Sequence, residues 1–333
     1  MTRRTALLLA LLPSAALAQE WSGASLRGAP ALRLPFGYTA EVVGVGFRLP
    51  QDLAVESAAA VWLLSQVDRA GGAGSLVRVP LDGAAPVEAA TLPAVSIPFG
   101  PGPARFRVGS LARHPTTGDL YVAEQSGRHL FRVSPAGDVV LYARGLERLA
   151  ETRAVAFDGA GRLIVLDLTG PPVVGEAGAA DLRALFGGAD AGPVLYRLRV
   201  DEPVQLPRNL EAFAPFLRSR PGGRSRYVGV LALSSGDLAL GGWTALIDRL
   251  RPDGSVVPLT RTPAARVAAA GPQGDLYALD SLGGRLVRIR PDGAVEEFVH
   301  GLVRPTAVAV LPDGSLIVAG DTGRILRLRA GAE

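Results

Sequence analysis

Short apolar runs separated by glycine-bearing turns repeat along this chain. One unit reads GDLYVAE at residues 118–124, then LFRV at 130–133, and ends at Gly137. A second copy reads GDLYALD at residues 274–280, then LVRI at 286–289, and ends at Gly293. From Gly118 to Gly137 and from Gly274 to Gly293 the spacing is the same, 19 residues. Apolar runs of this length, joined by turns that need positive φ, predict β-strands connected by tight hairpins.

The same unit can be placed six times along the chain. Its copies cover residues 51–83, 118–137, 161–198, 236–254, 274–293 and 314–328. Self-similarity at a period of about 40 residues, built from strands, is typical of a β-propeller. The sixth unit stops after its third strand, at Leu328, and an unassigned strand at residues 38–45 precedes the first unit. Pairing these two predicts an all-β, six-bladed propeller of four-stranded blades without an open sheet edge.

The N-terminus has the features of a secretory signal peptide. Arg3 and Arg4 precede a short apolar stretch, and Ala16-Leu17-Ala18 forms a small-residue cleavage site before Gln19. We therefore predict a signal peptide at 1–18, an N-terminal extension at 19–35 and a single propeller domain at 36–333. The apolar stretch is too short to span a bilayer, and no later stretch is long enough, so we expect an exported, periplasmic or secreted protein with no transmembrane segment.

Two segments interrupt the repeat. Residues 168–193 contain a predicted short helix at 179–186, and residues 206–227 connect the third unit to the fourth. In a propeller, both positions fall on the face that carries the connections between blades. We call this the loop-rich face, and we expect binding loops to gather there.

Composition excludes several kinds of chemistry. The chain has no cysteine, which excludes thiol catalysis and iron–sulfur clusters. All 35 basic residues are arginine, so no lysine can form a Schiff base. The net charge is only +4 and no basic cluster is interleaved with aromatic residues, so nucleic acid is not an expected partner.

The segment RPTAVAVLPDGSL at residues 304–316 resembles a blade start in NHL-type propellers, and LPQDLAV at 49–55 is a weaker copy. It is also similar to the gluconolactonase group and to sorbosone-dehydrogenase-like proteins. This resemblance implies a six-bladed propeller, with Ca²⁺ or pyrroloquinoline quinone as possible cofactors. The chain departs from both families. Its single asparagine, Asn209, lies outside the repeat, and none of His114, His129 and His300 falls at a strand start that would line the tunnel.

Arginines gather where the innermost strands are expected to begin. Aligning the six units places Gln51, Gly109, Arg153, Gly229, Arg266 and Thr306 in one register, with Arg107, Glu151, Tyr227 and Arg304 just before it. Guanidinium groups bind carboxylate or phosphate through paired hydrogen bonds, which predicts an anionic ligand. The alternative is that these arginines pair with neighbouring carboxylates such as Glu151. The candidate ligand-binding residues are Arg107, Arg153, Tyr227, Arg266, Arg304, Gln51 and Trp243; Trp243 may equally pack between blades.

Carboxylates end the second strands of three units. Glu124, Asp167 and Asp280 are weak candidates for a metal site, because carboxylate oxygens are the ligands that Ca²⁺ prefers. The alternative is that each carboxylate accepts backbone N–H groups in its own loop.

Two functions remain open. The first is an exported binding or protein-interaction scaffold, for a small anionic molecule or a protein partner. The second is an enzyme similar to gluconolactonases or to quinone-dependent sugar or aldehyde dehydrogenases, with a degenerate site. Whether the chain catalyses any reaction is not determined by these patterns.

Overall fold

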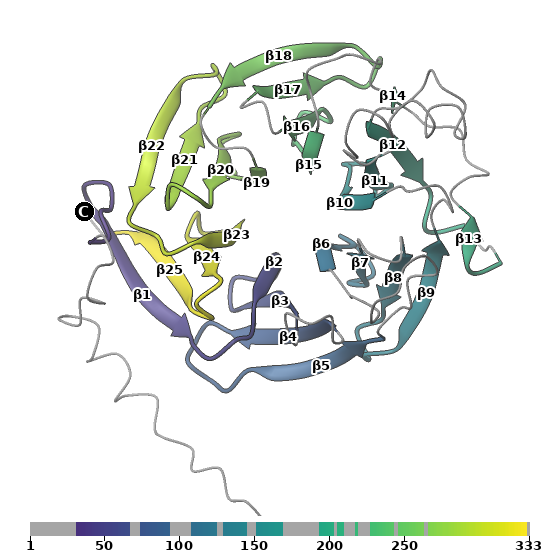
Figure 1. The fold of residues 1–333 in the computed structure, drawn as a ribbon, viewed down its shortest axis with the longest axis horizontal. Helices are drawn as coiled ribbons and strands as arrows, with labels where there is room; N and C mark the ends of the chain where they lie inside the picture. Colours follow the sequence, from purple (N-terminus) through teal and green to yellow (C-terminus); the bar gives the residue numbers. More distant parts are fainter. Residues whose placement is uncertain are drawn as a thin grey trace, which may run out of the picture.

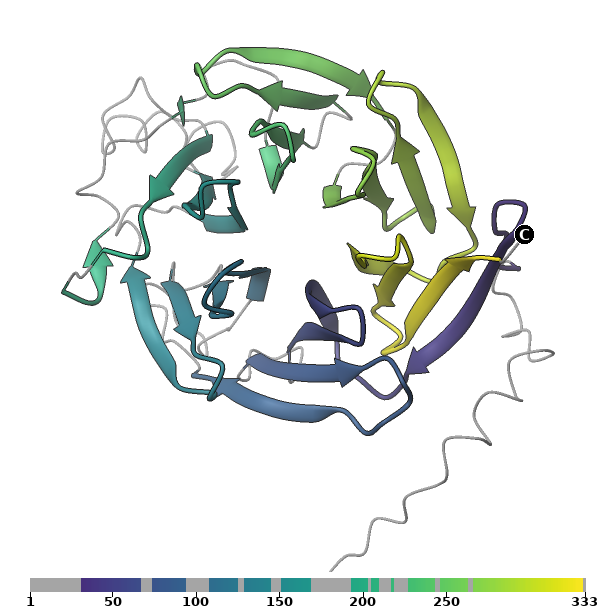
Figure 2. The same cartoon turned by 180° about the vertical axis from the view of Figure 1, so that it is seen from behind.

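The computed structural model describes residues 31–66, 74–93, 108–124, 129–144, 151–168, 193–202, 205–209, 217–218, 227–242, 246–262 and 266–331. Regular structure in these ranges is β-strand throughout. The strands form six antiparallel sheets arranged as blades around a central axis (Figures 1 and 2). The predicted six-bladed β-propeller is confirmed.

Blades 1 to 3 come from the first half of the chain. Blade 1 consists of β2 (Pro50–Ser57), β3 (Ala60–Gln66), β4 (Gly74–Pro80) and β5 (Val87–Leu92). Blade 2 consists of β6 (Val108–Arg113), β7 (Leu120–Glu124), β8 (His129–Val133) and β9 (Val139–Arg144). Blade 3 consists of β10 (Glu151–Phe157), β11 (Leu163–Leu168), β12 (Pro193–Leu198) and β14 (Leu217–Arg218).

Blades 4 to 6 complete the ring. Blade 4 consists of β15 (Tyr227–Ala232), β16 (Leu238–Gly242), β17 (Leu246–Leu250) and β18 (Val256–Arg261). Blade 5 consists of β19 (Arg266–Ala270), β20 (Leu276–Asp280), β21 (Arg285–Ile289) and β22 (Val295–His300). Blade 6 consists of β23 (Pro305–Val310), β24 (Leu316–Gly320), β25 (Ile325–Ala330) and β1 (Tyr38–Gly44).

The ring closes through the first strand of the chain. β1 pairs antiparallel with β25, from Tyr38 opposite Ala330 to Gly44 opposite Ile325. In Figure 1 the purple β1 lies outside the yellow β25 and completes blade 6. This pairing confirms the closure that the sequence predicted, and it covers the outer edge of β25.

The connector between blades 3 and 4 differs from a plain loop. Its β14 is the fourth strand of blade 3, and β13 (Arg208–Asn209) pairs in parallel with β9 of blade 2. Two-residue strands are too short to produce the alternation from which strands are recognised in a sequence. The predicted helix at 179–186 and the predicted signal peptide lie outside the described residues. Of the predicted extension at 19–35, Arg33 makes a two-way backbone bridge with His300 of β22.

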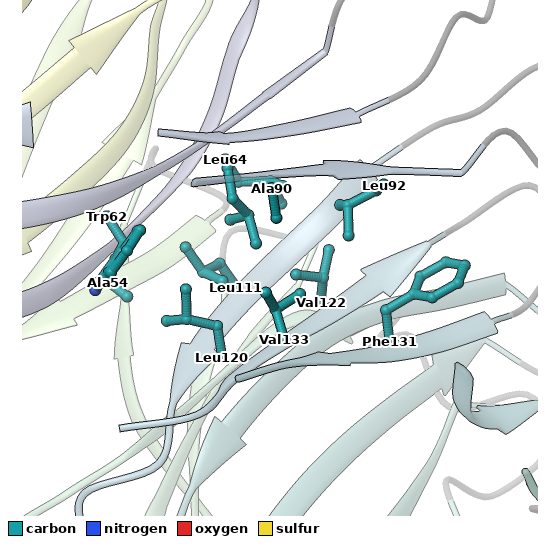
Figure 3. Close-up of a cluster of buried hydrophobic side chains, with 11 residues drawn as sticks. Ala54, Trp62, Leu64, Ala90, Leu92, Leu111, Leu120, Val122, Phe131 and Val133 are labelled. Carbon is teal, nitrogen blue, oxygen red and sulfur yellow. The ribbon is translucent and has the colours of Figure 1, made fainter. Parts of the chain in front are cut away.

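The core lies between neighbouring blades. Figure 3 shows one cluster at the boundary of blades 1 and 2, where Leu64, Ala90 and Leu92 face Leu111 and Val122. Five of the innermost strands bury an alanine, alongside larger side chains such as Leu53 and Leu111. These alanines include Ala54, Ala112, Ala154, Ala269 and Ala307.

One arginine recurs in the third strand of every blade. Five of the six lie within 4 Å of an acidic residue from the first hairpin of the same blade: Arg78–Glu56 at 2.7 Å, Arg197–Asp158 at 3.6 Å, Arg249–Asp237 at 3.8 Å, Arg288–Asp275 at 2.5 Å and Arg327–Asp313 at 2.8 Å. The sixth, Arg132, lies beside the buried Tyr121. These arginines therefore tie the first hairpin of a blade to its third strand.

Candidate functional site

Each innermost strand contains a β-bulge near its start. In four blades the skipped residue is the predicted one: Gln51, Gly109, Arg153 or Thr306. In blade 4 it is Val228, not Gly229. In blade 5 the bulge comes later, at Ala268, and Arg266 pairs in the ladder opposite Leu279. The single register predicted for the six starts is therefore wrong for Gly229 and Arg266. Both lie one ladder position further in, Gly229 because the bulge falls on the residue before it and Arg266 because blade 5 has no bulge at this place.

The predicted arginines begin different innermost strands. Arg153 is the bulge residue of β10, and Arg266 is the first residue of β19. Their side chains, and all of Arg107 and Trp243, lie outside the described part of the structure. Arg304 directly precedes β23; its side chain is 70% exposed, and its Nε lies 3.0 Å from Oδ2 of Asp321. Its φ of 44° is in the left-handed region, as is that of Leu49 before β2.

Two other predicted ligand-binding residues have protein partners. The Tyr227 hydroxyl donates to Oδ2 of Asp248 at 2.5 Å, and both residues are buried in blade 4. The Gln51 amide Nε2 donates to the carbonyl oxygen of Leu49 at 3.0 Å. A ligand that used either group would have to exchange one of these bonds.

The candidate metal ligands are held by their own blades. Oδ1 of Asp280 accepts the Gly283 N–H at 2.8 Å, and Oδ2 accepts from Arg285 Nη2 at 2.6 Å. Burial opposes ionisation of Asp280, but these hydrogen bonds outweigh it and lower the pKa of the carboxyl group. Glu124 is fully buried, with Oε2 3.7 Å from Nδ1 of His129. The side chain of Asp167 is outside the described residues.

His114, His300 and Asn209 lie away from the tunnel mouth. Nδ1 of His114 accepts the N–H groups of Thr116 and Thr117 at 3.2 and 3.0 Å, which ties it to its hairpin. His300 ends β22, the outermost strand of blade 5, and lies 3.3 Å from Glu297. The backbone of Asn209 pairs outside β9, at the rim of blade 2.

A cavity of about 500 Å³ follows the tunnel. It begins at the residues just after the bulges and extends to the turns of the first hairpins, on the face opposite the loop-rich face. Its lining includes Asp52, Ser110, Ala154, Gly229 and Ala268. Larger apolar side chains, among them Leu53, Leu111 and Phe157, complete the lining.

Two polar side chains of this lining bridge neighbouring blades, which the sequence patterns did not indicate. Oδ2 of Asp52 in blade 1 accepts the Leu111 N–H of blade 2 at 2.8 Å, and Oδ1 accepts the Leu53 N–H at 3.0 Å. The Ser110 hydroxyl of blade 2 accepts the Val155 N–H of blade 3 at 3.3 Å. Both residues directly follow the bulge, so their common position is recognisable only once the bulge is known.

Comparison with known proteins defines the fold class. No protein-family model matches the chain, and no curated protein matches it. Solved structures do. A gluconolactonase from Xanthomonas campestris has a TM-score of 0.58 at 12% identity and covers 91% of this chain and 98% of its own. The quinone-bound aldose sugar dehydrogenase from Streptomyces coelicolor has a TM-score of 0.57 at 19% identity, with coverages of 89% and 99%.

A third neighbour is virginiamycin B lyase from Staphylococcus aureus, with a TM-score of 0.57 at 14% identity and coverages of 87% and 99%. The chain is thus a six-bladed propeller similar in fold to gluconolactonases, quinone-dependent sugar dehydrogenases and streptogramin lyases. At these identities the likeness shows the fold alone.

The described residues contain no cluster of side chains that would hold a metal ion. Nowhere in the described ranges do three His, Cys, Asp or Glu side chains come together to hold a metal ion. Asp280 is already engaged by an arginine and a backbone N–H, and the described carboxylates come from different blades. A hard cation such as Ca²⁺ needs six or more oxygens around it. Within the described part of the chain there is also no helix long and apolar enough to cross a membrane.

Proposed function

We propose that this protein is an exported propeller that binds a small anionic molecule at the loop-rich end of its tunnel. The observation that carries the proposal is the position of Arg153 and Arg266. Each lies at the start of an innermost strand, in blades 3 and 5, and Arg304 precedes the innermost strand of blade 6. Guanidinium groups favour carboxylate or phosphate through charge-assisted hydrogen bonds, so strand starts that carry arginine suit an anionic ligand.

Binding is favoured over catalysis by the surroundings of the titratable groups. A general base must reach the proton that it abstracts, and His114 and Asp280 have their acceptor atoms engaged by backbone or arginine donors. We therefore propose a ligand-binding role, with an enzyme of the gluconolactonase or sugar dehydrogenase type as the alternative. A protein partner on the same face is the other alternative, and a ligand screen in which no small anion binds would favour it.

The test is a double variant, Arg153→Ala with Arg266→Ala. We expect it to fold as the parent does and to bind sugar acids and sugar phosphates, such as gluconate and glucose 6-phosphate, at least about tenfold more weakly, because each charge-assisted bond contributes about 1.5–3 kcal/mol. Isothermal titration calorimetry measures the affinities.

The matched control is Arg144→Ala with Arg261→Ala. Both residues are exposed and end the fourth strands of their blades, β9 and β18, so the same charge is removed far from the tunnel. This control should bind as the parent does. Equal affinities for the tunnel-mouth variant and the parent would contradict the proposal. Turnover of gluconolactone or of an aldose in the parent would favour the enzyme instead.

A further inference from the structure

The bridging role of Asp52 reveals a ring of backbone donors inside the tunnel. Leu53, Leu111 and Val155 hold the same ladder position, two residues after the bulge of their blade, and each donates its N–H to a side chain of an innermost strand. At this position the N–H therefore points away from the second strand of the blade. An innermost strand has only the tunnel and the adjacent blade on that side.

The same position in the other three blades is held by Val230, Val267 and Val308. Val230 pairs opposite Leu240 and Val308 opposite Val318, each two residues after its bulge. In blade 5 Val267 pairs opposite Ala278, which lies two residues before the end of β20. In the same way, Leu53 of blade 1 pairs opposite Leu63, which lies two residues before Ser65. Ladder geometry thus turns these three N–H groups toward the tunnel as well.

Blades 4 to 6 lack the acceptor that serves blades 2 and 3. The position of Asp52 is taken by Ala154 in blade 3, Gly229 in blade 4 and Arg266 in blade 5, none of which carries a hydrogen-bond acceptor in its side chain. Among the described residues, no side chain accepts a bond from the Val230 or Val308 N–H. A buried N–H needs a partner, so water or a ligand has to supply it.

Asp52 shows what kind of group fits. Its two carboxylate oxygens accept one N–H from their own strand and one from the next blade, at 3.0 and 2.8 Å. At the boundary of blades 4 and 5 the matching donors are Val230 and Val267, and the residue in the place of Asp52 is Gly229, which has no side chain. Gly229, Val230 and Ala268 all line the 500 Å³ cavity.

We propose that the carboxylate of a small ligand binds at this place, bridging the Val230 and Val267 N–H groups as the Asp52 carboxylate bridges those of Leu53 and Leu111. Charge favours it. β15 lies across the tunnel from β2, which keeps the ligand away from the negative charge of Asp52 (Figure 1). This inference goes beyond the proposed function, because it requires only that a carboxylate enters the tunnel and accepts bonds from backbone N–H groups.

The test uses acetate as the probe and the full chain labelled with [¹⁵N]valine. We expect the amide proton resonances of Val230 and Val267 to move downfield and saturate as acetate is added, because a carboxylate oxygen is a strong acceptor. Val155, which Ser110 already bridges, should not respond. Acetamide, of the same shape but neutral, should bind much more weakly. Absence of a saturable shift, or equal shifts at Val155, would overturn the proposal.

The matched variant is Gly229→Asp, which supplies the carboxylate within the chain; Gly229 pairs opposite Gly241 in the β15–β16 ladder, where the extended backbone accepts any residue. In this variant the amide resonances of Val230 and Val267 should already lie downfield without acetate. Acetate should bind at least about tenfold more weakly than to the parent, because the loss of one charge-assisted hydrogen bond lowers the affinity by about that factor. Unchanged acetate binding would refute the site.

A second variant guards against misfolding of the first. Asp52→Gly opens the same place at blades 1 and 2, and acetate should then raise its melting temperature more than chloride does at equal ionic strength. No difference between the two salts would count against the proposal. Separate experiments test the two proposals. The Arg153→Ala, Arg266→Ala variant tests the binding of sugar acids at the loop-rich end of the tunnel, whereas the acetate-induced shift of the Val230 resonance tests only the site at the Val230 and Val267 N–H groups.

Discussion

At the residue scale, two of the described carboxylates, those of Asp280 and Asp52, accept hydrogen bonds from other groups of the protein. Asp280 illustrates this, because one of its oxygens accepts a loop N–H and the other accepts from Arg285, which in turn contacts Glu297 at 2.7 Å. Asp280 thus follows the alternative interpretation, in which a carboxylate accepts a backbone N–H group of its own loop. Asp52 also accepts a backbone N–H group, but from the neighbouring blade.

The lowered pKa of Asp280 predicts a pH-dependent contribution to stability. A carboxyl group whose folded pKa is lowered stabilises the protein above its unfolded pKa, and that stabilisation is lost as pH falls through the folded pKa. Asp280→Asn should therefore lower the free energy of unfolding at pH 7 by about 1 kcal/mol, since hydrogen bonds to a charged group are lost. Urea unfolding between pH 7 and pH 2 measures the difference, which should shrink in acid.

The control is Asp292→Asn in the same blade. Asp292 accepts the Ala294 N–H at 2.9 Å in an exposed turn, a bond that an amide oxygen also accepts, so little change is expected. A destabilisation by Asp280→Asn that stays constant down to the lowest pH would contradict the role assigned to its charge.

At the scale of elements, strands from distant parts of the chain cover sheet edges. β1 completes blade 6, Arg33 bridges to β22 of blade 5, and β13 from the connector pairs with β9 of blade 2. Each of these partners is the outermost strand of its unit, whose unpaired N–H and C=O groups would otherwise be exposed. Residues of β1 also pack onto the core, Tyr38 with an edge contact to Phe298 at 5.1 Å between ring centroids.

Deleting residues 19–46 should destabilise the whole ring. The truncation unpairs β25 and exposes the core against which Tyr38 and Ala40 pack. We expect a melting temperature lower by roughly 10 °C or more, because several kcal/mol of pairing and burial are lost at about 2–4 °C per kcal/mol in a chain of this size. Glu41→Ala is the control, since it removes only the exposed ion pair with Arg329. A truncated chain that melts with the parent would show that the closure is dispensable.

At the scale of the whole molecule, the predicted export remains to be tested. The Ala16-Leu17-Ala18 site after a short apolar stretch predicts that the mature protein begins at Gln19. Intact-mass spectrometry of the protein exported by a bacterial host measures the start directly. A mass that retains residues 1–18 would refute the predicted cleavage.

The sequence by itself determined the class of fold, the six repeats and the closing strand. These depend on local features: apolar alternation within four to six residues, and glycines such as Gly254 and Gly293 whose positive φ makes the tight turns. Such features are read from neighbours along the chain.

Only the tertiary structure decided the register of the innermost strands, the paths of β13 and β14, and the bridges made by Asp52 and Ser110. In blade 5 the bulge lies at Ala268, two ladder positions further along the innermost strand than in the other blades, without any change in the apolar pattern. The bond from Leu111 to Asp52 joins residues 59 apart, and the positions it defines in the other blades exist only when all six strands surround one axis. Hydrogen-bond partners are set by spatial proximity, which the order of residues does not encode locally.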